Sequence, residues 1–235
     1  MQRSNADCTL VIMAKAPRQG AVKTRLASVL LPDAVTAFYR CLLEDTLSLA
    51  QRLNDVEVSI MCPSSDVSEL VQLARGEVSV VAQEGHGLAA ALTSVFAHFI
   101  TSHERRIIAF NSDSPHLPPA VLQSAFDMLS TYDIVVGPTH DGGYYLVGAK
   151  AVHPALFARD GMGTSSALET LLAQARTLGL SVGFTDLFYD VDVSDDLARL
   201  AMELSLAPER APRTAKWLNE RETAAAQSYV SARSS

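Results

Sequence analysis

Short apolar runs alternate with longer segments of helical periodicity along the first 130 residues. Runs rich in apolar and β-branched residues predict buried strands over residues 9–14, 56–62, 78–82 and 107–110. A helix that opens at Pro32 carries Val35, Phe38 and Leu42 on one stripe. Further helices are expected over residues 66–74, 88–103 and 119–130. This alternation predicts a mostly parallel sheet with helices on both faces.

A turn signal interrupts the alternation after residue 138. Asp141-Gly142-Gly143 lies between two apolar runs, 133–138 and 144–149, which is typical of a β-hairpin. The hairpin would add an antiparallel piece to the sheet. The elements expected after it are a helix through Arg176, a strand over 180–184, a helix capped by Ser194 and a terminal helix over 208–222, before a polar tail at 227–235.

The length of 235 residues fits one domain, with a core over about residues 8–205. Hydrophobic residues make up 48% of the chain and charged residues 19%, which is enough apolar material for a full core. The expected fold is therefore a Rossmann-like α/β protein, a three-layer α/β/α sandwich with a mixed, mostly parallel sheet.

Charge and cysteine content narrow the classes of function. The net charge of -7 argues against a nucleic-acid-binding protein, which usually carries a basic excess. The first apolar run has seven residues, too few for a membrane span, and it lacks the layout of a signal peptide. The three cysteines are few and far apart, which favours a reducing compartment. We expect a cytoplasmic protein with no membrane or nucleic-acid partner; a homodimer stays an option.

One carboxylate, Asp113, follows the strand expected at 107–110. The carboxyl ends of the strands are where open α/β sheets bind their ligands. We therefore interpret Asp113 as the holder of a divalent cation that in turn holds a nucleotide diphosphate. The alternative is a turn residue that caps the helix beginning at Pro118-Pro119. Taken alone, Asp113 fits both interpretations equally well.

A basic loop follows the first expected strand. Its four cations are Lys15, Arg18, Lys23 and Arg25. Cations and backbone N–H groups in such a loop can surround phosphates. The alternative is a solvated basic loop, but the position directly after the first strand favours phosphate binding. The loop is not a Walker P-loop, because the required glycine spacing is absent.

A glycine loop, QEGHGL, precedes the helix expected at 88–103. Its glycines permit close backbone approach to a ligand, so Gln83 and Gly85 are candidates for contact with a nucleotide or its phosphates. His86 could also face the ligand. A plain strand-to-helix turn is nearly as good an interpretation.

Three more acidic residues are candidates for the same site. Asp141 is either a hairpin residue or a hydrogen-bond acceptor or general base beside the acceptor substrate. Asp190 and Asp192 are two apart, so at strand spacing their side chains share one face. Asp66, by contrast, is expected only to cap the short helix after it.

Cations and carboxylates in one crevice suit a metal-bridged diphosphate or triphosphate. Carboxylate oxygens bind Mg²⁺ or Mn²⁺, and Lys or Arg neutralises the remaining phosphate charge. A transferase that expels a diphosphate or a nucleotide needs its leaving group stabilised in this way.

Four segments in order carry a family resemblance: VIMAKAPRQGAVKTRLA, FNSDSPHLP, GPTHDGGYYLVGA and DVDVSDDLARL. The chain resembles the bacterial glycosyltransferase-like family of unknown function 2064, which is associated with radical-SAM and selenodomain genes. That family is similar to 2-phospholactate guanylyltransferases and to molybdenum-cofactor guanylyltransferases. The resemblance spans roughly residues 9–200 and implies a GT-A, nucleotide-diphospho-sugar transferase fold.

The resemblance also implies roles for individual residues. The four cations match the phosphate-binding loop, and Asp113 matches the metal-binding aspartate that stands in for a DxD motif. Asp190 or Asp192 falls where related enzymes place a second metal ligand. Two features depart from the pattern: Asn111 occupies the first DxD position, and His86-Gly87 stand where the guanylyltransferases have an acidic residue.

Three functions follow from these expectations. The first is a metal-dependent glycosyltransferase that moves a sugar from a nucleotide-diphosphate sugar to a small acceptor. The alternative is a nucleotidyltransferase that couples a nucleoside triphosphate to a phosphorylated small molecule and releases pyrophosphate. A non-catalytic nucleotide-binding protein is the third.

Overall fold

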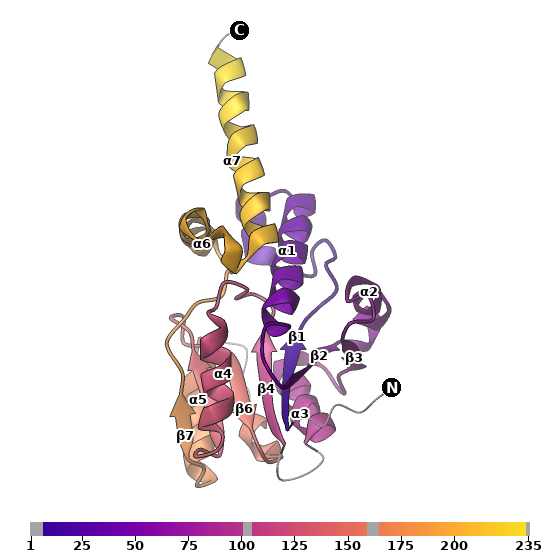
Figure 1. The fold of residues 1–235 in the computed structure, drawn as a ribbon, viewed down its shortest axis with the longest axis vertical. Coiled ribbons are helices and arrows are strands. Elements are labelled where there is room, and N and C mark those ends of the chain that lie inside the picture. The colour runs from indigo at the N-terminus through magenta and orange to yellow at the C-terminus, as the bar shows by residue number, and fades with distance from the viewer. Residues whose placement is uncertain (1–6, 101–104, 159–164, 234–235) are drawn as a thin grey trace.

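The computed structural model describes residues 7–100, 105–158 and 165–233, and it contains a seven-stranded sheet between helices (Figure 1). The strand order is β3-β2-β1-β4-β6-β5-β7. The strands are β1 (Cys8–Met13), β2 (Val56–Cys62), β3 (Ser79–Ala82), β4 (Arg106–Asn111), β5 (Ile134–Pro138), β6 (Tyr144–Ala149) and β7 (Val182–Phe184).

The helices lie close to the expected segments. They are α1 (Pro32–Ala50), α2 (Val67–Leu73), α3 (Gly87–Phe99), α4 (Pro119–Met128), α5 (Ala167–Thr177), α6 (Ser194–Leu206) and α7 (Pro212–Arg233). Four 3₁₀ turns connect them in the described segments, at Thr24–Ser28, Ser64–Asp66, Pro154–Phe157 and Pro208–Arg210.

The N-terminal half of the sheet is parallel. Strand β1 pairs in parallel with β2 and with β4, and β2 pairs in parallel with β3. Leu10, Val11 and Ile12 of β1 are completely buried, as a central strand covered on both faces requires. All these strands point their carboxyl ends to one edge, where loops from distant parts of the chain meet.

The hairpin predicted at Asp141 is confirmed. Strand β6 pairs antiparallel with β5 and with β4, while β7 adds to β5 in parallel. Gly142 in the turn has φ of +87°, and a Cβ there would collide with the carbonyl oxygen of Ser165, so only glycine fits. The sheet is therefore mixed and mostly parallel, as predicted.

Helices cover both faces of the sheet. On one face, Leu43 of α1, Leu70 of α2 and Phe126 of α4 belong to one buried cluster. On the other face, Phe96 of α3 and Leu171 of α5 belong to a second cluster. The sheet and the helices packed on its two faces thus form the three layers of the predicted α/β/α sandwich.

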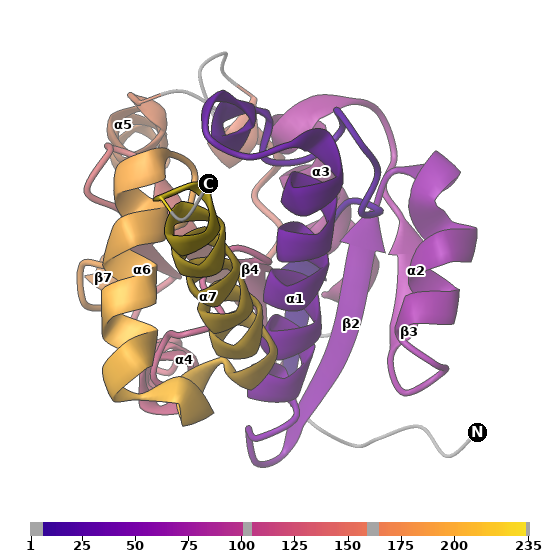
Figure 2. The ribbon, with the colours of Figure 1, turned by 90° about the horizontal axis from the view of Figure 1, so that it is seen from above.

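A third cluster joins α1, α6 and α7 at the carboxyl edge of the sheet. Phe38 of α1, Leu200 of α6 and Leu218 of α7 are buried in it. Seen from above, α7 lies between α6 and α1 (Figure 2). The last part of the chain is thus attached to the edge at which the first strands end.

The terminal helix differs from the expectation. Helix α7 runs to Arg233, beyond residue 222 and into the segment expected to be a polar tail, and it projects from the body (Figure 1). No glycine or proline interrupts residues 213–233, and three consecutive alanines favour the helix. Residues 234–235 lie outside the described part of the chain. Over the described segments, no helix combines the length and apolar character needed to cross a bilayer.

Candidate functional site

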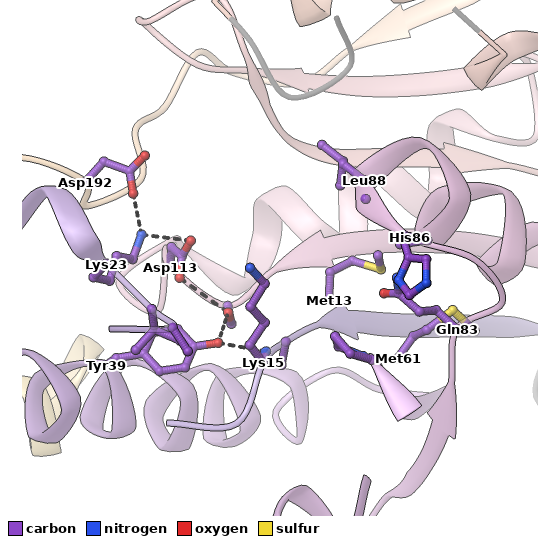
Figure 3. A pocket seen from close by; sticks show the side chains of 17 residues that line it. Met13, Lys15, Lys23, Tyr39, Met61, Gln83, His86, Leu88, Asp113 and Asp192 are labelled. Atoms are coloured by element: carbon purple, nitrogen blue, oxygen red, sulfur yellow. Dashed lines mark hydrogen bonds and ion pairs between the residues drawn. The ribbon is translucent and has the colours of Figure 1, made fainter. Parts of the chain in front are cut away.

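A cavity of about 540 Å³ opens at the carboxyl ends of β1, β2 and β4 (Figure 3). One end carries charge, with Lys15 and Lys23 beside Asp113 and Asp192. The opposite end is formed by residues of β1, β2 and the glycine loop: Met13, Met61, Gln83, His86 and Leu88. A cavity of this size accommodates a nucleotide-sized molecule.

Three carboxylates meet at the charged end. Asp113 lies two residues after β4, whereas Asp190 and Asp192 lie between β7 and α6. One oxygen from each of the three lies within 4.8 Å of the others. Three carboxylate oxygens form a donor set that suits a hard divalent ion such as Mg²⁺ or Mn²⁺.

The structure excludes one of the two interpretations of Asp113, that of a helix cap. Helix α4 has Pro118 before its first turn and no side-chain cap, so Asp113 does not cap it. Instead, the Oδ2 atom of Asp113 lies 2.8 Å from the Nζ atom of Lys23. Asn111, at the first DxD position, donates to Ser114 Oγ at 3.3 Å and stays within its own turn.

The surroundings of Asp190 and Asp192 set the pKa of the first and the position of the second. Burial raises the pKa of Asp190 to about 6, and the nearby charge of Asp192 adds to this increase. Above that pH, Asp190 is available as an anionic ligand. Asp196 fixes this segment, because its Oδ2 atom accepts hydrogen bonds from the backbone N–H groups of Asp192 at 3.0 Å and Val193 at 2.9 Å. Ser194, the expected cap, is instead the first residue of α6.

Lys23 lies between two of these carboxylates. Its Nζ atom is 2.8 Å from Asp113 Oδ2 and 2.7 Å from Asp192 Oδ1. Burial of the ammonium group lowers the pKa of Lys23, but the two carboxylates outweigh this effect and the net shift is upward. The backbone of Lys23 is left-handed, with φ of +45°, which costs a non-glycine residue about 1–2 kcal/mol.

Lys15 is placed differently. Its side chain projects into the cavity (Figure 3), and its ammonium group makes no ion pair within the described residues. Its backbone N–H donates to the hydroxyl group of Tyr39 at 3.1 Å. That hydroxyl also lies 3.0 Å from Ser112 Oγ, whose own neighbour is Asp113. Tyr39 thus links the basic loop to the turn that carries the candidate metal ligand.

The other two cations of the loop do not line the cavity. Arg18 pairs with Asp66 at 2.7 Å and with Glu69 at 2.9 Å. Arg25 is largely exposed, with Asp192 Oδ2 at 3.7 Å. Of the four cations predicted to bind phosphate, Lys15 and Lys23 therefore line the cavity, whereas Arg25 is exposed near Asp192 and Arg18 attaches the loop to Asp66 and α2.

Asp66 does not cap α2 as predicted, although it directly precedes that helix. Its Oδ2 atom accepts the backbone N–H of Ala16 at 2.9 Å, and its Oδ1 atom accepts from Arg18. These contacts hold the loop against the protein, and with the ionic contact to Arg18 they lower the pKa of Asp66 despite its burial, which acts in the opposite direction. Asp66 is therefore a positioning residue for the basic loop.

We expect Asp66→Ala to destabilise the fold by about 2 kcal/mol, because it leaves the buried N–H of Ala16 without an acceptor. Urea unfolding measures the effect. The matched control is Glu69→Ala, which removes the more exposed partner of Arg18 and should change stability by less than about 1 kcal/mol. Equal effects of the two variants would contradict the role of Asp66.

The glycine loop forms the wall of the cavity opposite the carboxylates. Gln83 donates to the carbonyl group of Gly85 at 3.2 Å, and Gly85 and Gly87 have φ of +74° and +81°. Gln83, His86 and Gly87 line the cavity, whereas Gly85 does not line it and only forms the turn of the loop. The geometry thus allows a ligand in the cavity to contact this loop, as predicted.

Asp141 occupies the hairpin turn. Its Oδ1 atom accepts hydrogen bonds from Thr139 Oγ1 at 2.5 Å and from the backbone N–H of Gly143 at 3.1 Å, which is sufficient reason for an aspartate there. It is not among the three carboxylates whose oxygens lie together, although its charge contributes to the raised pKa of Asp190. Its role as a base stays a prediction.

The turn after β4 also holds a buried histidine. His116 is stacked against Phe188 and Tyr189, with ring centroids 4.8 and 4.7 Å away, and neither ring nitrogen has a hydrogen-bond partner. Burial, aided by the positive charges of Arg210 and Arg199, lowers the pKa of His116 to about 3. The imidazole therefore stays neutral in the folded protein.

This histidine makes stability depend on pH. Below about pH 6.5 the unfolded chain takes up a proton that the folded chain refuses until about pH 3, so stability falls as the pH decreases through this window. The loss is about 2–3 kcal/mol at pH 4.5. Denaturant unfolding from pH 7 to 4.5 should show a shallower decline for His116→Phe than for wild type. Parallel curves would contradict the assignment.

Several of these functional contacts were not apparent from sequence patterns. Tyr39 falls beside the apolar stripe of α1, Asp66 has the pattern of a helix cap, and Asp196 has that of a first-turn acid. Each makes its contact with a residue that lies elsewhere in the chain or outside its own helix. One local feature could have pointed to Asp66: the turn at residues 63–66 directly follows β2, at the edge of the sheet where ligands bind.

Known structures share this architecture. A proposed nucleotide-diphospho-sugar transferase from Desulfovibrio desulfuricans G20 is 26% identical, with a TM-score of 0.84 over 93% of this chain and 96% of that chain. Rv0371c from Mycobacterium tuberculosis H37Rv is 22% identical, with a TM-score of 0.55 over 82% and 97% of the two chains. The inositol-1-phosphate CTP transferase from T. maritima is 16% identical, with a TM-score of 0.56 over 86% and 96%.

These likenesses confirm the predicted fold, that of nucleotide-diphospho-sugar transferases. The name of the D. desulfuricans protein also agrees with the prediction of a transferase. No curated protein matches the sequence. One family model matches residues 46–164, just over half of the chain, under the description "uncharacterized protein conserved in bacteria". The chain belongs to that family, DUF2064, as its four motifs predicted.

Proposed function

We propose that the protein is a metal-dependent transferase whose donor substrate is a nucleotide bound through its phosphates. The observation that carries the proposal is the meeting of three carboxylates and two lysines at one end of a nucleotide-sized cavity. A fully structural acidic cluster would need no cavity and no uncommitted ammonium group. Here Lys15 projects into open space beside the carboxylates.

Each group has a role in this proposal. Asp113, Asp190 and Asp192 would hold Mg²⁺ or Mn²⁺, which supplies positive charge for a leaving diphosphate. Lys15 neutralises phosphate charge that points away from the carboxylates. At the other end, Met13 and Met61 offer an apolar surface for the base, and polar atoms of Gln83 and His86 lie beside it. A crystal structure of Rv0371C contains manganese, which supports the choice of ion.

The first candidate reaction is transfer of a sugar from a nucleotide-diphosphate sugar to a small acceptor. It is supported by the likeness to the D. desulfuricans protein, which extends over nearly the whole of both chains. In this reaction the nucleoside diphosphate leaves, and the charged end of the cavity stabilises it. Asp141 stays a candidate for the base that activates the acceptor.

The second candidate is nucleotidyl transfer with release of pyrophosphate. Two observations favour it. Asn111 makes the DxD pair incomplete, and the second carboxylate comes instead from the segment before α6. The fold is also shared with the CTP transferase from T. maritima. Here Lys15 and Lys23 would face the leaving pyrophosphate.

Product analysis separates the candidates. The protein is incubated with Mn²⁺ and either nucleotide sugars or nucleoside triphosphates, each with a panel of hydroxylated and phosphorylated acceptors. Release of a nucleoside diphosphate from a nucleotide sugar supports the first candidate, and release of pyrophosphate supports the second. Binding of nucleotides without either product would favour the non-catalytic alternative. No nucleotide binding at all would contradict the proposal.

A further inference from the structure

We propose that the ammonium group of Lys23 is a tethered counter-ion that competes with the divalent ion for the carboxylate site. The divalent ion then enters together with the nucleotide. The ammonium group of Lys23 leaves the carboxylates and pairs with the phosphates of that nucleotide. This inference rests on the proposed function and adds an order of binding to it. It concerns one group, Lys23 Nζ, and two oxygens, Asp113 Oδ2 and Asp192 Oδ1.

Distances make the two cations mutually exclusive. Lys23 Nζ lies 2.8 and 2.7 Å from those two oxygens, and a magnesium ion would lie about 2.1 Å from its ligands. A divalent ion bound by the same oxygens would thus sit almost on the ammonium nitrogen. The remaining oxygens are occupied or crowded, because Ser112 donates to Asp113 Oδ1 and Arg25 approaches Asp192 Oδ2.

The buried ammonium group of Lys23 needs another anionic partner if it leaves the carboxylates. Its side chain is only 4% exposed, so the ammonium group needs a counter-charge wherever it lies. It lines the same cavity as Lys15, so phosphate oxygens entering the cavity are the available anionic replacement. The free ion brings no such replacement, whereas a metal–phosphate complex does.

The backbone conformation of Lys23 also supports this proposal. Its left-handed φ of +45° is unusual for a residue with a long side chain. The neighbouring 3₁₀ turn, Thr24–Ser28, begins directly after it, and its own side chain supplies no cap. The structure thus holds a lysine in an unfavourable conformation that places its ammonium group between two carboxylates, which is a reason to assign the conformation a function.

Manganese binding tests the competition without any turnover. Free Mn²⁺ is titrated by electron paramagnetic resonance against wild type, Lys23→Gln and Lys15→Gln, first alone and then with whichever of UDP, GDP or CDP raises the melting temperature most. Lys15→Gln is the matched control, because it removes the same charge from the same cavity without vacating the carboxylates.

We expect Lys23→Gln to bind Mn²⁺ at least tenfold more tightly than wild type in the absence of nucleotide. Lys15→Gln should stay within about threefold of wild type, a change that reflects the general loss of one positive charge. Addition of the nucleotide should strengthen Mn²⁺ binding far more in wild type than in Lys23→Gln. Asp113→Asn in the Lys23→Gln background should remove the gain.

The variant Lys23→Gly covers the case in which loss of the ammonium group prevents folding. Glycine adopts φ of +45° without strain, so the substitution offsets part of the cost of the unpaired carboxylates, and circular dichroism confirms folding. Equal Mn²⁺ affinity of wild type and the folded Lys23 variant would overturn the competition, as would weaker binding. The proposed function is tested separately by nucleotide binding and product release, which survive that result.

Discussion

Asp113→Asn is expected to reduce transferase activity about 10³-fold or more while leaving the fold intact. The amide is isosteric but neutral, so the cluster loses one of three anionic ligands, and several kcal/mol of charge stabilisation at the leaving group is lost with it. Lys23 keeps Asp192 as a partner at 2.7 Å, so no buried charge is left unpaired. Steady-state kinetics over a range of Mn²⁺ concentrations measures the effect.

The matched control for this prediction is Asp195→Asn. Asp195 lies in the first turn of α6, close in sequence to the cluster, and is exposed there. Its charge is explained by favourable interaction with the helix N-terminus. Activity should therefore stay within about twofold of wild type for Asp195→Asn. Comparable activity of Asp113→Asn and wild type would show that Asp113 is not a metal ligand.

Asp45→Ala should cause the largest loss of stability, about 3–5 kcal/mol. The carboxylate of Asp45 is completely buried in α1. It accepts hydrogen bonds from Thr214 through both N–H and Oγ1 at 2.8 Å, and from the N–H of Arg213 at 3.2 Å. Alanine leaves these donors at the first turn of α7 without an acceptor and removes one of the partners of the Arg213 guanidinium group.

Urea unfolding measures this loss, with Glu44→Ala as the control. Glu44 is the neighbouring acid on α1 and also lies near Arg213, at 3.4 Å, but its side chain is partly exposed. Its removal should cost less than about 1 kcal/mol. If the two variants lost equal stability, the cap on α7 would not be the reason for the buried carboxylate.

The order of strands and helices was predictable because it depends on local periodicity. Continuous apolar runs such as 9–14 are typical of strands buried on both faces, and the turn at Asp141-Gly142-Gly143 accepts only glycine at position 142. The turn even specified where the sheet becomes antiparallel. The position of Asp113 after a central strand, together with the family resemblance at residues 190–192, indicated that these carboxylates would lie together, and their oxygens do.

The partners of the charged residues were not predictable from local patterns. Arg18 and Lys23 are both cations of the loop after β1, yet Arg18 pairs with Asp66 and Glu69 whereas Lys23 pairs with Asp113 and Asp192. The difference arises from tertiary packing that no spacing rule contains. The cap of α6 was misassigned for a local reason: the helix begins at Ser194, and Asp196 in its first turn accepts the N–H of Val193.

The most direct test of the central claim is anomalous X-ray scattering from crystals grown with Mn²⁺ and the nucleotide that stabilises the protein most. We expect one manganese peak in contact with Asp113 and with Asp190 or Asp192, phosphate oxygens on the ion and near Lys15, and the base between Met13 and Met61. A nucleotide bound elsewhere, or one bound in the cavity with no manganese at Asp113, would contradict the account.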